Sequence, residues 1–142
     1  MGSKLFAERL RGAIAGYFFS FAVGMLWVAS ADIQKLSDPR IRGFLLLYIA
    51  TIGSVAILAG LIGYWVFCQK PFAALLSIVF MTVMAVAFFI GSTGVGLGKG
   101  PNFHTGRFLV GHVSSLMIIG ASVWLWKRDN KEGAKSGSRG AV

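Results

Sequence analysis

The stretch that decides the fold is Gly43–Phe67, GFLLLYIATIGSVAILAGLIGYWVF, which contains no charged residue. About 20 predominantly apolar residues suffice for an α-helix to cross the ~30 Å hydrocarbon core of a bilayer. The segment is longer than a buried helix of a soluble domain needs. It therefore predicts a transmembrane helix.

Similar apolar runs lie on both sides of this stretch, and we expect four helices at about 12–31, 43–67, 72–95 and 106–126. The chain of 142 residues is 56% hydrophobic and only 13% charged, whereas soluble domains are about a quarter charged. The sequence predicts an all-α integral membrane protein, an up-down bundle of four transmembrane helices without an extramembrane domain. A basic N-terminus (1–11) precedes the membrane domain (12–128), and a disordered basic tail (129–142) follows it.

The connections refine this prediction. The first run is longer than the ~7 to 15 apolar residues of a signal peptide, so we expect a retained helix. Asp38 and Pro39 mark a turn in the polar connection after it. Only Cys68–Pro71 links the second and third runs, which predicts an antiparallel hairpin of these two helices.

The distribution of lysine and arginine predicts the orientation in the membrane. Four crossings place both termini on one side, and this side, with the Cys68 hairpin, carries nine of the 14 cations. They are Lys4, Arg9, Arg11, Lys70, Lys127, Arg128, Lys131, Lys135 and Arg139. By the positive-inside rule, the termini belong on the cytoplasmic or equivalent side. The net charge of +9 thus indicates topology and contacts with lipid headgroups, not nucleic-acid binding.

Small residues recur at helical spacing in several runs. In lipid, close packing at such residues drives helix association. We expect helix-packing faces, either inside the chain or against another subunit, that include Gly12, Gly16, Ser20, Gly24, Gly53, Gly60, Gly111 and Ser115.

Several classes of function lack the residues that they need. The five acidic residues all lie outside the apolar runs, and no serine, histidine and acid constellation indicates nucleophilic catalysis. The glycine-rich segment 91–106 fails the phosphate-loop pattern, since Thr93 and Gly100 occupy positions that require Gly and Ser or Thr. One cysteine, Cys68, allows no internal disulfide. We therefore predict no enzyme, no metal site and no nucleotide binding.

The stretch Pro101–Trp126 holds both histidines of the chain, His104 and His112. Eight residues of α-helix separate two side chains by ~12 Å of rise and ~80° of rotation, so they cannot hold one metal together. Intramembrane ionisable groups usually mark functional sites. His112 has three interpretations: a structural hydrogen bond to a neighbouring helix, an axial ligand to haem b or a chlorin, or a proton or quinone role. His104 is either an exposed loop residue or, with Arg107, a group that binds a quinone carbonyl or a pigment propionate.

The function that these features favour is that of a non-catalytic subunit of a larger membrane complex, of respiratory or photosynthetic energy transduction, packed through its small-residue faces. Its partners would be membrane lipids and other subunits or copies of itself. The first alternative is a haem- or chlorin-binding electron-transfer or pigment subunit with His112 as the axial ligand. The second is a small channel or transporter.

Overall fold

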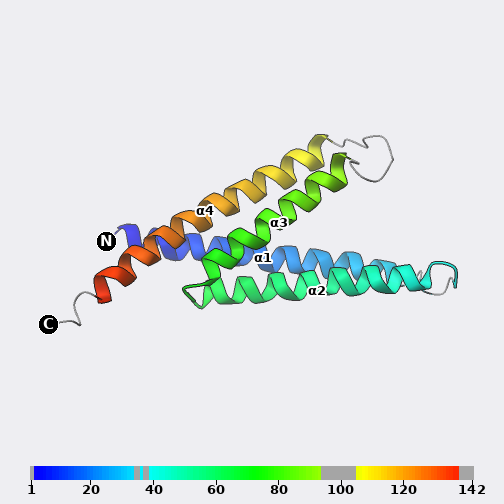
Figure 1. Ribbon diagram of the computed structural model, residues 1–142, viewed down its shortest axis with the longest axis horizontal. Coiled ribbons are helices and arrows are strands. Elements are labelled where there is room, and N and C mark those ends of the chain that lie inside the picture. The colour runs from blue at the N-terminus through cyan, green and yellow to red at the C-terminus, as the bar shows by residue number, and fades with distance from the viewer. Residues whose placement is uncertain (1, 34–35, 37–38, 94–104, 138–142) are drawn as a thin grey trace. The chain divides into compact units, whose positions relative to one another are not determined.

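The computed structural model describes residues 2–33, 36, 39–93 and 105–137. These residues form four helices and contain no strand. In chain order the helices are α1 (Gly2–Ile33), α2 (Arg42–Phe67), α3 (Ala73–Thr93) and α4 (Thr105–Gly137) (Figure 1). The all-α class that the sequence predicts is confirmed.

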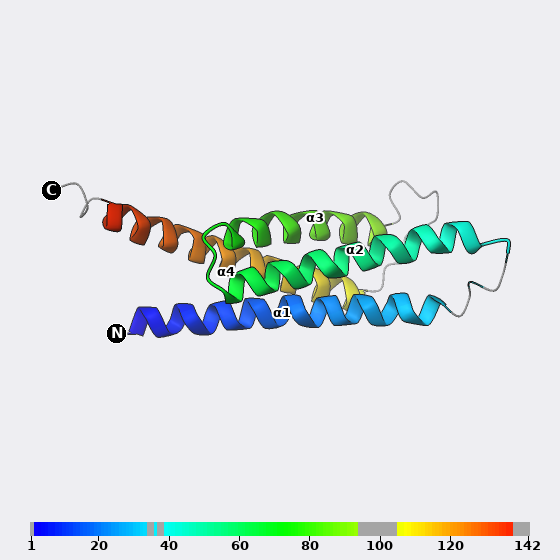
Figure 2. The ribbon, with the colours of Figure 1, turned by 90° about the horizontal axis from the view of Figure 1, so that it is seen from below.

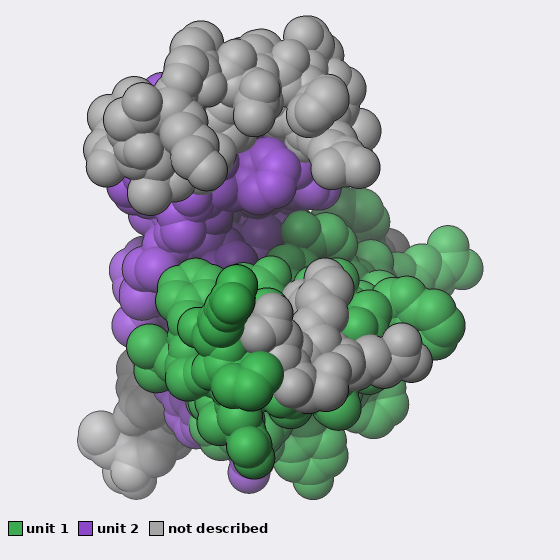
Figure 3. All heavy atoms as spheres, turned by 90° about the vertical axis from the view of Figure 1, so that its right-hand side faces the viewer, with its two compact units in different colours: residues 1–69 green, residues 70–142 purple. Residues whose placement is uncertain are grey.

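The helices divide between two compact units, residues 1–69 and residues 70–142 (Figure 3). The first unit contains α1 and α2, and the second contains α3 and α4. Each unit is an antiparallel pair of helices, as the two ribbon views show (Figures 1 and 2). The boundary between the two units falls between Gln69 and Lys70, in the short link that the sequence assigns to a hairpin of the second and third helices.

In the first unit the two helices approach closely near the C-terminal end of α2. An added Cβ at Gly63 of α2 would lie 3.0 Å from the Cβ of Phe18 and 3.2 Å from the carbonyl oxygen of Ala15, both on α1. Phe18 and Ala15 are buried, with at most 2% of their surface exposed. Glycine is therefore the residue that lets the two backbones approach here.

In the second unit a pair of buried hydroxyls joins the helices. The Oγ atoms of Ser77 on α3 and Ser122 on α4 are 2.8 Å apart, and neither residue is exposed. Ser77 Oγ also lies 2.8 Å from the carbonyl oxygen of Ala74. Since a serine hydroxyl carries one proton, both contacts are satisfied when Ser122 donates to Ser77 and Ser77 donates to Ala74.

Three helical segments of the described chain are long and apolar enough to cross a membrane: Lys4–Ala31, Arg42–Phe67 and Ala73–Ile90. Large apolar side chains are exposed along them, for example Trp27, Phe44 and Leu47, each at least 68% exposed. Such exposure is costly in water and favourable in lipid. The chain is therefore a multi-pass integral membrane protein.

Two helices extend beyond the apolar runs. α1 begins at Gly2, where the sequence predicts a helix from Gly12, and α4 continues to Gly137, although the sequence predicts a disordered tail from Asp129. Hydropathy marks where a run stops being apolar, whereas lysine, arginine and glutamate sustain a helix in water as well as leucine does. In α4 an ion pair between Arg128 and Glu132, at 3.0 Å, adds support over one turn.

Candidate functional site

The small-residue face of α1, defined here as Gly12, Gly16, Ser20 and Gly24, is open among the described residues. A Cβ added at any of its three glycines would meet no described atom within 4 Å. All four residues are exposed. The spacing of four residues places them in one row along the helix. A second helix could approach this row as closely as α2 approaches α1 at Gly63.

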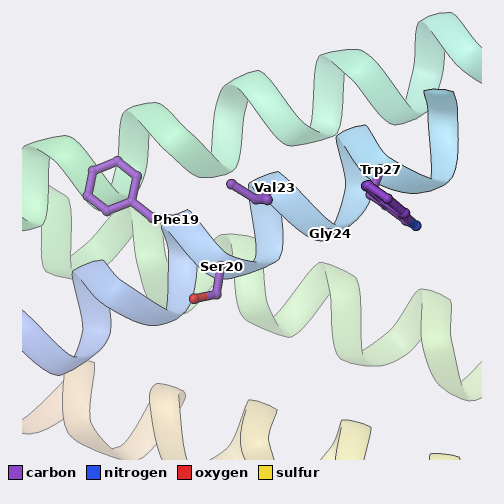
Figure 4. A pocket seen from close by; sticks show the side chains of 5 residues that line it. All are labelled: Phe19, Ser20, Val23, Gly24 and Trp27. Atoms are coloured by element: carbon purple, nitrogen blue, oxygen red, sulfur yellow. The ribbon is translucent and has the colours of Figure 1, made fainter.

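A shallow hollow of about 510 Å³ lies on the same helix. Figure 4 shows its five lining residues, all from α1: Phe19, Ser20, Val23, Gly24 and Trp27. Ser20 and Gly24 belong to both the hollow and the small-residue face of α1, and Trp27, which also lines the hollow, is 77% exposed. The hollow and the small-residue face of α1 thus form one continuous apolar surface.

The glycines of α2 differ in how closely α1 approaches them. Gly63 is buried against Phe18 and Ala15, while a Cβ at Gly60 would meet Ala22 of α1 at 4.0 Å, an ordinary contact. At Gly53 an added Cβ would meet no described atom within 4 Å. The packing of α1 against α2 therefore becomes closer toward the C-terminal end of α2.

His112 lies between the aromatic side chains at the end of α3. Its ring centroid is 5.6 Å from that of Phe88, at an interplanar angle of 79°, and 6.0 Å from that of Phe89, at 60°. The Nε2 atom of His112 is buried. The imidazole is thus packed edge to face within the second unit, in an arrangement that aromatic rings favour.

The residues around His112 are arranged for close packing. A Cβ added at Gly111 would lie 2.7 Å from Cε1 of Phe88, so the glycine makes room for this ring. The hydroxyls of Ser114 and Ser115 both donate to the carbonyl oxygen of Gly111, at 3.1 Å and 2.8 Å. Of the two residues of α4 that the sequence assigns to a packing face, Gly111 thus lies against Phe88 of α3, and Ser115 is buried.

The sequence names two further candidate ligands, His104 and Arg107. His104 lies outside the described residues, and Arg107 lies in the first turn of α4, where only the backbone is described. On the neighbouring helix α3, Thr82 donates its hydroxyl to Ile78 of its own helix at 2.8 Å. Among the described residues, no group of three histidine, cysteine or acidic side chains could hold a metal ion.

Sequence reasoning left out two features that the structure brings together. In the sequence Phe88 and Phe89 suit lipid contact, a helix core or an apolar pigment or quinone pocket, and only the antiparallel pairing of α3 with α4 places them beside His112. The bond between Ser77 and Ser122 joins residues 45 positions apart. Its one signal in the sequence is a serine in each of two apolar runs, which does not identify the pair.

Comparison of the chain with protein-family models, with curated proteins and with solved structures gives no match. The function is therefore argued from the geometry of the residues themselves.

Proposed function

We propose that the protein is a non-catalytic subunit of a larger membrane complex and that it binds a partner helix through α1. In this proposal α4 supplies a fourth crossing through Phe108–Trp126, both termini lie on the cytoplasmic or equivalent side, and the four helices complete an up-down bundle. The supporting observation is the open small-residue face of α1 together with the hollow beside it.

The physical argument rests on what glycine contributes in lipid. Because lipid tails are as apolar as leucine, helices associate in a membrane through close packing, which small residues permit. Gly63 already serves this purpose between α1 and α2. Glycine in the middle of a helix costs roughly 0.5 to 1 kcal/mol relative to alanine. The glycines at positions 12, 16 and 24 would offset this cost by the contacts of a partner helix.

The described hydroxyl groups support packing over a polar path. Thr51, Ser54, Thr82 and Ser115 all donate to carbonyl oxygens four residues earlier in their own helices. Such bonds satisfy the hydroxyl without a ligand and are common for serine and threonine within helices. This arrangement favours a packing subunit over a channel or transporter.

The substitution Gly16→Leu tests the proposal. We expect it to abolish incorporation into the complex while the isolated protein stays folded, because no described atom lies within 4 Å of the added Cβ. Native electrophoresis of solubilised source membranes would show the loss of the large species, and unfolding in detergent would show that the fold is retained. Mass spectrometry of the wild-type species identifies its partners.

Gly120→Leu is the matched control, since Gly120 on α4 is also exposed and a Cβ there meets no described atom within 4 Å. This variant should assemble as the wild type does. If Gly16→Leu also assembled normally, the small-residue face of α1 would not be the docking face. If both variants failed, the effect would be a general one of bulk in the membrane.

A second candidate function follows from the position of His112, which would be the axial ligand of a haem or a chlorin. A metal ligand must present a ring nitrogen to the metal. Since Nε2 is buried beside two phenylalanine rings, a flat macrocycle could reach it only after side chains had moved. The packed state supports a structural histidine, with Phe88 and Phe89 as its neighbours.

A visible absorption spectrum separates the two functions. We expect the protein purified in mild detergent to be colourless in the oxidised and the reduced state. An absorption band that is present in the wild type and lost in His112→Ala would show that the protein is a cofactor-bearing subunit, of redox or light-harvesting type. The proposal of a packing subunit would then be wrong. His104→Ala is the control, because the same loss there would assign the ligand to the other histidine.

A further inference from the structure

A basic stripe runs along one face of α4 where the apolar run ends. It is defined here as Trp124, Lys127, Arg128 and Lys131. Successive residues of an α-helix are turned by about 100°, so these four side chains fall within a sector of about 100°. The first acid after the tryptophans, Asp129, points about 100° further round than Arg128. The cations thus share one side of the helix.

The members of the stripe differ in what they contact. The guanidinium of Arg128 lies 5.8 Å from the ring centroid of Trp124 and forms an ion pair with Glu132 at 3.0 Å. Only 15% of its side chain is exposed. Lys127 and Lys131, by contrast, are both exposed. The charge of Arg128 is therefore directed at Trp124 and Glu132 of its own helix, and the two lysines present the charge of the stripe to the surroundings.

The depth of the stripe follows from the tryptophans. Trp124 and Trp126 are 40% and 37% exposed and end the apolar run, as tryptophans at headgroup level do. At 1.5 Å per residue, Lys127 and Lys131 lie about 2 and 8 Å beyond Trp126 along the helix. The headgroup region occupies about 5 to 8 Å on each side of the hydrocarbon core. In the proposed crossing of α4, both ammonium groups would therefore lie at the level of lipid phosphates.

We propose that the basic stripe of α4 binds the phosphate groups of anionic lipids in the leaflet at the C-terminal end of this helix. The inference rests on the crossing of α4 that forms part of the proposed function. Each lysine ammonium offers three donors to phosphate oxygens. The continuous helix keeps Lys127 and Lys131 one turn apart, so neighbouring headgroups can be bound side by side.

The test uses the full-length protein, reconstituted in bilayers of phosphatidylcholine containing a minority of phosphatidylglycerol. Spin-labelled forms of both lipids report the selectivity of the lipid shell by electron paramagnetic resonance. We expect preference for phosphatidylglycerol in the wild type. In Lys127→Gln/Lys131→Gln the association with this lipid should fall about fivefold for each lysine removed, the equivalent of about 1 kcal/mol each.

Lys4→Gln/Arg9→Gln is the matched control, because it removes the same charge from exposed positions of α1. This variant should keep the preference for phosphatidylglycerol. An equal loss in both variants would show an effect of net charge alone and would overturn the proposal, as would a wild type without preference. Raised salt should weaken the preference, since exposed charges are screened beyond about 3 Å at 1 M ionic strength.

A separate measurement shows whether α4 crosses the membrane. In a Cys68→Ser background, single cysteines at Lys131→Cys and Thr105→Cys would be labelled by an impermeant maleimide in sealed vesicles. Labelling from opposite sides establishes the crossing, and loss of lipid selectivity is then assigned to the stripe. Labelling of both cysteines from one side would show that α4 does not cross the membrane and would overturn this proposal. The docking of a partner helix on α1 is tested independently by Gly16→Leu.

Discussion

Replacing Gly63 with leucine should separate α1 from α2. The Cβ alone would lie 3.0 Å from Cβ of Phe18 and 3.2 Å from the carbonyl oxygen of Ala15. Neither atom can turn away, because both are fixed to the backbone of α1. Either the two helices move apart or the side chain is strained, and overpacking of this kind typically costs about 1 to 3 kcal/mol. Leucine adds three further carbons, so we expect an effect at or above the top of this range.

The measurement is the midpoint of unfolding in a titration with a denaturing detergent, followed by circular dichroism. Gly63→Ala should lower the midpoint less than Gly63→Leu does, since alanine adds only the Cβ and both residues gain up to about 1 kcal/mol of helix propensity over glycine. Gly53→Leu is the control on the same helix, because an added Cβ there meets no described atom within 4 Å. Equal midpoints for Gly63→Leu and Gly53→Leu would show that the contact at Gly63 does not hold the pair together.

This pair of glycines also shows what the sequence could and could not predict. The periodicity of small residues in the second run predicts a packing face, but Gly53 and Gly60 fit this pattern as well as Gly63 does. Which glycine meets the neighbouring helix most closely depends on the angle and rotation of two helices. Those variables are set by residues far apart in the chain, such as Phe18 and Gly63, and no local pattern contains them.

The ends of the helices follow the same logic. Hydropathy predicts the crossing segments because the bilayer requires about 20 apolar residues whatever the neighbours are. It does not predict that α1 begins at Gly2 or that α4 continues to Gly137. In water, a helix end is decided by propensity and by local pairs such as Arg128 with Glu132. The extension of α4 is what aligns Lys127 and Lys131 on one face.

The sequence identifies His112 as a candidate residue but does not predict its neighbours. An imidazole in an apolar run is a clear signal of interest, and the residue indeed lies within the helix pair. Its neighbours, however, come from the far end of α3, and the two rings approach because Gly111 leaves room for Phe88. A packing function and a ligand function use the same residue type at the same position. Only the surroundings distinguish them.

The second large effect is expected in the other unit, where Ser122→Leu should separate α4 from α3. Ser122 has no exposed surface, and its hydroxyl meets that of Ser77 at 2.8 Å. Leucine would remove this bond and would need space that the contact does not offer. Interhelical hydrogen bonds in membranes contribute about 0.6 to 2 kcal/mol, and overpacking adds about 1 to 3 kcal/mol.

Ser122→Ala separates the two contributions. Alanine removes the bond without adding bulk, so its cost should stay within the hydrogen-bond range. In a cycle with Ser77→Ala, the double variant should cost less than the sum of the single ones, because the two serines share one bond. Strict additivity would mean that the bond contributes nothing to stability.

Thr82→Leu is the control for bulk on the same pair of helices, since Thr82 is exposed and donates its hydroxyl to Ile78 of its own helix. Spin labels at Val86→Cys and Val113→Cys, both exposed, would measure the distance between α3 and α4 in a Cys68→Ser background. The distribution of distances between the two labels should become broader, with a longer mean distance, in Ser122→Leu. It should stay unchanged in Thr82→Leu. His112 lies between the same two helices, so its contact with Phe88 should be lost when α3 and α4 separate. The arrangement around the histidine therefore depends on the buried hydroxyl pair of Ser77 and Ser122.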